Sequence, residues 1–200
     1  MICVACDYPE SLSGPYDTSW SKEDALTRVD ILDAVLADVQ SSYPTSGRIG
    51  LLGHSLGSGL ASSFDTKDPL SPRCCIAGFR AVGETAKSSP FLVIASEGDS
   101  VCPSTFVMER VADVRKNNVK VGGGEVEGLF LEKYNHIDFL SAETNDAMVD
   151  FLSPLLPVAR TLKVPLLDFD KYAENPNSKE CFEAIESKVL NFFTTNLLER

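Results

Sequence analysis

Short apolar segments alternate with amphipathic segments along this chain. Short, mainly apolar segments typical of buried strands occur at residues 2–8, 48–53, 73–79, 91–96 and 129–134. Apolar positions three and four residues apart predict helices at residues 21–42, 56–64 and 104–116, and a last helix at 178–198. Strands that alternate with helices and are apolar throughout are typical of a parallel sheet buried on both faces. The pattern therefore predicts the α/β class, with a mostly parallel sheet covered by helices on both sides.

The size of the chain fits one domain. The sequence has 200 residues, and a chain of this length buries roughly 70% of its unfolded surface, which is enough for a real core. Apolar residues make up 44% and charged residues 24%, which excludes a disordered chain or a coiled coil. No internal repeat or clear linker interrupts the pattern. We therefore expect a single domain over residues 1–200.

The charge balance bears on partners and location. The net charge of −11 repels nucleic-acid phosphates and anionic lipid surfaces, so we expect no nucleic-acid partner. No apolar run is long enough for a transmembrane helix, and the first residues, MICVACDYPE, do not have the pattern of a secretory signal. Six cysteines are too few for a disulfide scaffold. These features favour the cytoplasm as the location.

The cysteines are interpreted as buried thiols. Cys3 and Cys6 form a C-x-x-C pair inside a predicted strand, and Cys74 and Cys75 are adjacent on another, where they would point to opposite faces. Neither pair has a further Cys or His at zinc spacing, so no metal site is expected. Free cysteines are among the most buried residue types, which favours a core role for all four.

One motif carries chemistry by itself. The segment Gly53-His54-Ser55-Leu56-Gly57 fits G-x-S-x-G and stands between a predicted strand and a predicted helix, the context that the motif requires. The turn strains the backbone at the serine, and glycines on both sides let the neighbouring backbone pass. The positive end of the helix favours an oxyanion, for which the N–H of Leu56 is the expected donor. Ser55 is thus the candidate nucleophile.

A serine nucleophile needs a base, and the chain has only two histidines. His54 belongs to the turn itself and is expected to pack beneath it. His136 follows a predicted strand, at the carboxyl edge where parallel sheets form their sites. His136 is therefore the candidate base.

The base in turn needs an orienting carboxylate. Asp99 lies in the loop after the strand at 91–96, next to a glycine that permits a tight turn, and is the first choice. Glu97 and Asp138 remain alternatives, although Asp138 is only two residues from His136 and would reach its ring with difficulty.

The chain order Ser55, Asp99, His136 is that of the α/β-hydrolases. With the segments GHSLGSG, SEGDSVCP and YNHIDF, the sequence resembles that family, in the range of small esterases, lipases, chlorophyllases and dienelactone hydrolases. The resemblance implies further strands ahead of residue 2 and an upstream HG-containing loop that supplies a second oxyanion donor. We therefore expect an N-terminally shortened version of the fold, with an exposed sheet edge that favours self-association.

The spacing of the motifs bears on the cleft. The 44 residues from Ser55 to Asp99 leave room for one short strand but no large cap, which predicts an open cleft. Apolar residues flanking the acid and base loops are candidates for an acyl pocket, although a core role is favoured: Phe106, Met108, Phe139 and Leu140.

Two hypotheses of different class follow. In the first, the chain is a serine hydrolase that cleaves a small-molecule or lipid carboxylic ester through an acyl-enzyme, without cofactor or metal. In the second, it is a non-catalytic interaction protein of α/β-hydrolase type or a truncated, inactive product. A dinucleotide-binding domain is excluded because no G-x-G-x-x-G follows the first strand.

Overall fold

The structure of the chain is a computed structural model. The described residues are 22–43, 47–66, 70–80, 88–121, 124–141 and 178–198, with single residues at 4, 68, 143, 150, 154, 157, 158 and 161. The chain divides into two compact units, Met1–Arg48 and Ile49–Arg200. The prediction of a single domain over residues 1–200 stays a prediction.

The described part of the first unit consists chiefly of helix α1, Lys22–Ser42. Its apolar residues Val29, Leu32 and Leu36 are half-buried, whereas Asp30 and Asp33 are exposed, as the predicted amphipathic pattern requires. The predicted strand at residues 2–8, with Cys3 and Cys6, lies outside the described residues. So does most of the helical segment predicted from residue 141 to the start of the last helix.

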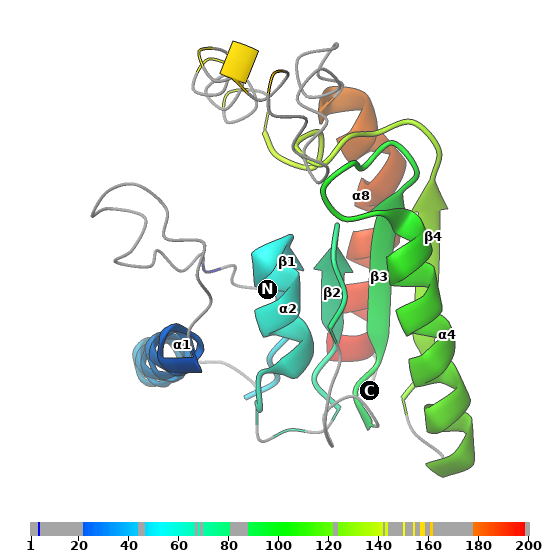
Figure 1. The fold of residues 1–200 in the computed structure, drawn as a ribbon. Helices are drawn as coiled ribbons and strands as arrows, with labels where there is room; N and C mark the ends of the chain where they lie inside the picture. Colours follow the sequence, from blue (N-terminus) through cyan, green and yellow to red (C-terminus); the bar gives the residue numbers. More distant parts are fainter. Residues whose placement is uncertain are drawn as a thin grey trace. The chain divides into compact units, whose positions relative to one another are not determined.

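The second unit contains a four-stranded, fully parallel sheet in the order β1-β2-β3-β4 (Figure 1). The strands are β1 (Leu51–His54), β2 (Arg73–Ile76), β3 (Phe91–Ser96) and β4 (Val126–Leu131). Among the residues that the structure describes, three helices accompany them: α2 (Leu56–Ser63), α4 (Ser104–Val121) and α8 (Ser178–Leu197). Because all strands run in one direction, their carboxyl ends meet at one edge, where the candidate motifs follow β1, β3 and β4.

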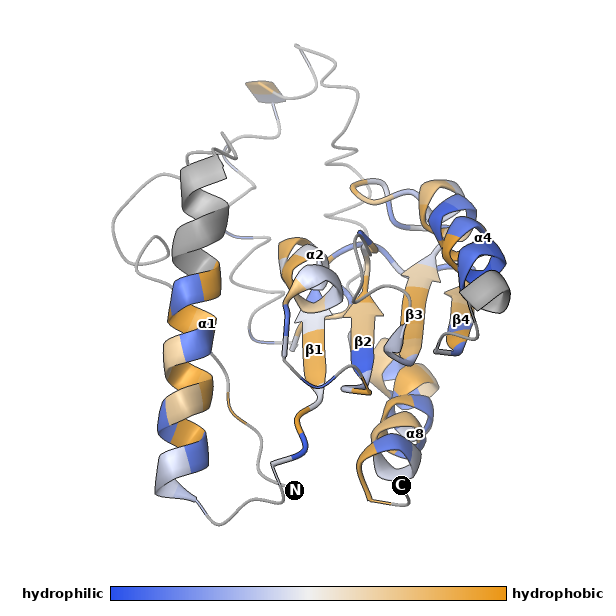
Figure 2. Cartoon of the chain, turned by 90° about the horizontal axis from the view of Figure 1, so that it is seen from below, coloured by the Kyte–Doolittle hydropathy of each residue, from blue (hydrophilic) through white to orange (hydrophobic). Residues whose placement is uncertain are grey.

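Helices cover both faces of this sheet. Figure 2 shows α2 and α4 on one side of the strands and α8 on the other. Alternate residues of the strands point to opposite sides, so the sheet builds two cores. Cys74, Leu92 and Ile94 pack with residues of α8, and Cys75 and Val93 pack with residues of α4. The prediction of an α/β fold with helices on both faces is confirmed, and the adjacent cysteines do point to opposite faces.

The predicted boundaries needed correction at three strands and one helix. β1 spans Leu51–His54 rather than 48–53, β2 ends at Ile76 rather than at residue 79, and β4 spans Val126–Leu131 rather than 129–134. Helix α4 ends at Val121 rather than at residue 116. In β4 the register is set by pairing with β3, which aligns Val126 with Phe91 and Leu131 with Ser96. The apolar run alone could not show this offset, since periodicity places strand ends only loosely.

Strand β1 is less buried than β2 and β3, in which every residue is buried. Leu52 is 56% exposed, whereas Cys74, its neighbour in register on β2, is fully buried beneath α8. In the described part of the chain, β1 pairs with β2 alone. The predicted self-association through a sheet edge stays a prediction.

No helix of the described residues is both long and apolar enough to cross a membrane.

Candidate active site

The G-x-S-x-G segment forms a sharp turn from β1 into α2. Ser55 adopts φ 53° and ψ −115°, a left-handed φ that non-glycine residues rarely take. Two backbone hydrogen bonds hold the turn: the Ser55 N–H donates to the Ile76 carbonyl at 2.8 Å, and the Ser58 N–H donates to the Ser55 carbonyl at 3.0 Å. Hydrogen bonds to α2 and to β2 thus hold the strained backbone of Ser55 in place.

The two glycines of the motif differ in what they do. A Cβ on Gly53 would lie 2.1 Å from the Gly57 carbonyl oxygen, so only glycine fits where the strand meets the helix. A Cβ on Gly57 would meet no described atom within 4 Å. The prediction that both glycines relieve crowding of the backbone is therefore wrong for Gly57.

The side chain of Ser58 stabilises the turn through hydrogen bonds to the backbone of β1 and β2. Its hydroxyl is buried and lies 2.7 Å from the Gly53 carbonyl oxygen and 2.6 Å from the Ile76 carbonyl oxygen. A hydroxyl has one proton to donate, so the two carbonyls at the ends of β1 and β2 share it. Nothing in the bare motif points to Ser58, whose role depends on the depth at which α2 packs.

His136 connects the nucleophile to a carboxylate. Its Nε2 lies 2.8 Å from Ser55 Oγ, and its Nδ1 lies 2.8 Å from Asp99 Oδ2. A carboxylate accepts hydrogen bonds, so Nδ1 carries the proton that it donates to Asp99. Nε2 is then free to accept the Ser55 hydroxyl proton. The His136 and Asp99 side chains are 8% and 0% exposed, so water competes little for this hydrogen bond.

Asp99 is held from two sides. Oδ2 accepts from His136, and Oδ1 accepts the backbone N–H groups of Val101 at 2.9 Å and Cys102 at 2.8 Å. Three donors compensate the burial of the carboxylate. The two backbone donors also fix the orientation of the carboxylate, so that Oδ2 faces the imidazole of His136.

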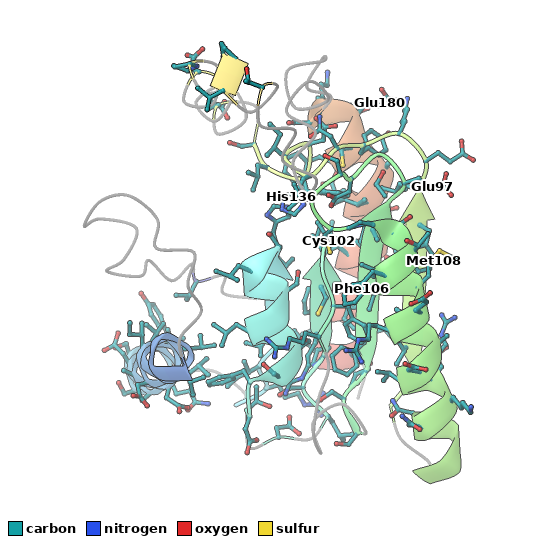
Figure 3. All side chains as sticks on the ribbon, viewed as in Figure 1. Glu97, Cys102, Phe106, Met108, His136 and Glu180 are labelled. Atoms are coloured by element: carbon teal, nitrogen blue, oxygen red, sulfur yellow. The ribbon has the colours of Figure 1, made fainter. Side chains whose placement is uncertain are left out.

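The two alternative carboxylates lie elsewhere. Glu97 is exposed and lies toward the end of β4, away from His136 (Figure 3). Asp138 is buried, and its Oδ2 accepts the backbone N–H of Asn135 at 2.8 Å, so it braces the loop that carries His136. Of the three candidate carboxylates, Asp99 is the one that lies within hydrogen-bond distance of the His136 ring.

A further serine joins the acid loop to the base loop. Ser96, the last residue of β3, is buried, and its Oγ accepts the N–H groups of Tyr134 at 2.9 Å and Gly98 at 3.3 Å. Gly98 packs so closely on the base loop that a Cβ would lie 2.7 Å from the Tyr134 carbonyl oxygen. Gly98 was predicted to permit a tight turn, and in the structure it also allows this close contact between the two loops.

His54 contacts the base loop directly. Its Nε2 lies 2.9 Å from the main-chain carbonyl oxygen of His136, and the two imidazole rings are 4.8 Å apart between centroids. The centroid of the Phe139 ring lies 6.2 Å from that of the His54 ring. Burial, together with the neighbouring His136, lowers the pKa of His54 to about 4. The expectation that His54 merely packs beneath the turn missed this contact.

Apolar residues near the site divide into core and surface. Phe139 is buried in the core beneath α8, as favoured from the sequence. Phe106 and Met108 on α4 are 51% and 46% exposed, so the core role favoured for them is wrong. The Arg110 guanidinium lies 5.7 Å above the Phe106 ring. Leu56, directly after the nucleophile, is 40% exposed, and Leu140 is partly buried.

The described residues contain no cluster of three or more His, Cys, Asp or Glu side chains that could hold a metal ion. Cys102 belongs to the acid loop, where its backbone N–H donates to Asp99, and burial raises the pKa of its thiol to about 11. It is therefore protonated at neutral pH and is a weak candidate nucleophile beside Ser55.

No protein-family model matches this sequence, and no curated protein sequence shows significant similarity to it. Among solved structures, an α/β serine hydrolase homologue from Coxiella burnetii is 20% identical, with a TM-score of 0.46 over 62% of this chain and 54% of that one. SOBER1 from Arabidopsis thaliana is 13% identical, with a TM-score of 0.46 over 58% of each chain. Esterase PE8 is 19% identical, with a TM-score of 0.49 over 70% of this chain and 68% of that one.

This chain thus spans little more than half the length of the first two structures. The likeness is partial, and it does not bear on the activity or the substrate of this chain.

Proposed function

We propose that this chain is a serine hydrolase of α/β-hydrolase type that cleaves a carboxylic ester through a covalent acyl-enzyme. The observation that carries the proposal is the unbroken series of hydrogen bonds from Ser55 Oγ through His136 to Asp99, with 2.8 Å at each step. The left-handed backbone at Ser55, between a strand and a helix, supports the same role for that residue.

In this mechanism each of the three residues has one task. His136 Nε2 takes the hydroxyl proton as Ser55 Oγ attacks the carbonyl carbon of the ester, and a tetrahedral oxyanion forms. His136 then donates that proton to the leaving alcohol as the C–O bond breaks, and the acyl group stays on Ser55. Asp99 keeps the Nδ1 proton in place and stabilises the imidazolium.

Water completes the cycle by the same route. His136 Nε2 removes a proton from water, whose oxygen attacks the acyl-enzyme, and the proton returns to Ser55 as the carboxylic acid departs. The oxyanion is proposed to accept the backbone N–H of Leu56. At the first position of α2 this group has no carbonyl four residues earlier in the helix to bond to.

The proposed substrate is a small-molecule or lipid ester. Leu56 is an exposed apolar side chain next to the nucleophile, which fits an acyl or alcohol group of low polarity. The net charge of −11 disfavours strongly anionic substrates. Neither a cofactor nor a metal enters the proposed mechanism.

The test is labelling with a fluorophosphonate, which phosphonylates activated serines, followed by mass spectrometry of the modified peptide. We expect the label on Ser55. It should be absent from Ser55→Ala and at least 10²-fold slower in His136→Ala, because a general base contributes roughly 10²–10⁴-fold.

Correct folding of each variant is checked by circular dichroism and thermal unfolding. A folded wild-type protein that neither takes the label nor hydrolyses a panel of short and long p-nitrophenyl esters would contradict the proposal. In that case a non-catalytic role for the same fold gains the support.

A further inference from the structure

The second histidine of the chain occupies an unusual place beside the first. His54 precedes the nucleophile in sequence, yet its ring contacts the loop of the base, 82 residues further along the chain. The contact joins the end of β1 to the loop after β4, which are separated in the sheet by β2 and β3. It is therefore a direct link between the strand that presents Ser55 and the loop that presents His136.

The chemistry of this contact determines the protonation of His54. A main-chain carbonyl can only accept, so the Nε2 atom that lies 2.9 Å from the His136 carbonyl oxygen must carry a proton and donate it. With Nε2 protonated, the neutral ring leaves Nδ1 without a proton. The structure thus requires one tautomer of His54, and that tautomer is a measurable property.

The charge of His54 matters because of its neighbour. The proposed reaction turns His136 into an imidazolium, and a second positive ring at a centroid distance of 4.8 Å would oppose that change. Burial and His136 lower the pKa of His54, while Asp99 and the hydrogen bond to the His136 carbonyl act in the opposite direction. The net result, a pKa of about 4, keeps His54 neutral at pH 7.

We propose that His54 is a positioning residue for the base: as a neutral Nε2–H donor it fixes the backbone of His136, and so the distance from the imidazole to Ser55 Oγ. This inference rests on the proposed hydrolase function. The hydrogen bond of His54 goes to the main chain of His136 and not to the imidazole that takes the proton, so His54 acts through the backbone of the base. Displacement of a catalytic group by about 1 Å can slow a reaction by 10²-fold, so a single hydrogen bond to this loop has consequences for the rate.

The test compares two substitutions of similar size. His54→Gln retains an N–H donor at the ε position, whereas His54→Phe fills the space with a ring that cannot donate. We expect His54→Gln to take the fluorophosphonate label at Ser55 within about threefold of the wild-type rate. His54→Phe should be slower by about tenfold or more, with the loss in kcat rather than in KM for a p-nitrophenyl ester.

A core variant serves as the matched control for lost stability. Val111 on α4 is buried away from this contact, so Val111→Ala should lower the unfolding temperature without slowing the labelling of folded protein. Equal rates in His54→Gln and His54→Phe would overturn the proposal, because the donor would then be irrelevant.

A second measurement needs no activity. Because the chain has only two histidines, ¹⁵N-labelled protein gives two imidazole spin systems, which His54→Gln assigns. We expect His54 at pH 7 as the neutral tautomer with the proton on Nε2. We also expect the His136 ring signals to shift in His54→Phe far more than in His54→Gln.

The two measurements separate this proposal from the proposed function. If wild-type protein takes no label but shows the expected tautomer and shifts, the hydrolase function fails and the contact of His54 with the base loop stands. If Ser55 is labelled but His54 carries its proton on Nδ1, the hydrogen bond does not exist and the positioning role is overturned.

Discussion

The two ends of the parallel sheet both bury a charged side chain, and they do so for different purposes. At the carboxyl end, Asp99 accepts three hydrogen bonds, one of them from the His136 ring that also reaches Ser55. At the amino end, Arg73 begins β2 and is fully buried. Its Nη1 donates to the Ala61 carbonyl at 2.7 Å, and its Nε donates to Ser89 Oγ at 3.0 Å.

The partners explain the difference. Asp99 faces an ionisable ring that itself faces a hydroxyl on a strained turn, so its charge can act on a reaction. Arg73 faces a helix carbonyl and a hydroxyl, and its Nη2 has no hydrogen-bond partner among the described residues. Burial lowers the pKa of the guanidinium, while Asp65 acts in the opposite direction. A buried charge therefore indicates a functional site only where other reactive groups converge on it.

The largest expected effect lies at the carboxyl end. Asp99→Asn keeps the shape of the side chain, but an amide can donate to His136 Nδ1 and so favours the wrong tautomer. We expect the rate of fluorophosphonate labelling at Ser55 to fall by roughly 10⁴-fold, the size of effect known for such a change in a serine protease.

Glu97→Gln is the matched control, because this exposed carboxylate lies away from His136 and its loss should leave the rate within twofold. A comparable fall in both variants would point to general electrostatics rather than to a specific contact.

At the amino end the expected loss is in stability and not in rate. Arg73→Ala leaves a cavity and an unpaired Ala61 carbonyl, and should lower the free energy of unfolding by about 2–4 kcal/mol. Arg73→Met fills most of the space and should cost less. Urea unfolding measures both.

Labelling of the folded fraction of Arg73→Ala should proceed at nearly the wild-type rate. A rate more than tenfold lower would show that the two ends of the sheet are coupled, and would remove the distinction drawn between them.

A smaller effect is expected from pH at the carboxyl end. The pKa of His54 is about 4 in the folded chain and 6.5 as its ordinary value, so between these pH values the unfolded chain binds a proton that the folded chain does not. Stability is therefore complete above pH 6.5 and is lost as the pH falls toward 4, by up to about 3 kcal/mol.

His54→Gln removes this pH-dependent contribution of the imidazole to stability. The difference in unfolding free energy between wild type and variant should therefore change between pH 4 and 6.5 and stay constant above pH 6.5. A difference that does not depend on pH from 4 to 7 would contradict the low pKa.

The smallest effect concerns the second glycine of the motif. Gly57→Ala places a methyl group in open space and favours the helix, so the free energy of unfolding should change by less than about 1 kcal/mol, with a gain expected. The contrasting variant is Gly53→Ala, whose Cβ would overlap the Gly57 carbonyl. Thermal unfolding of the two proteins measures the contrast. Equal loss in both would mean that the motif needs two glycines for packing.

The sequence by itself was enough for the class of fold and for the order of the strands and helices that the structure describes. Apolar runs and amphipathic segments depend on local spacing, and they correctly predicted β3 over 91–96 and the last helix to within a residue. The G-x-S-x-G segment placed Ser55 at a strand-to-helix turn by the same kind of local information. Its catalytic role, like those of Asp99 and His136, stays a proposal until labelling tests it.

Long-range geometry decided what local patterns could not. Three carboxylates near the base were compatible with the sequence, and only the approach of two loops, allowed by Gly98, brings Asp99 to the His136 ring. The exposure of Phe106 and the contact of His54 with a loop 82 residues away likewise depend on how the elements pack. Periodicity records which side of an element is apolar. Distances between side chains from different elements are set by packing alone. The choice of Asp99 as the partner of His136, and the contact of His54, therefore needed the tertiary structure.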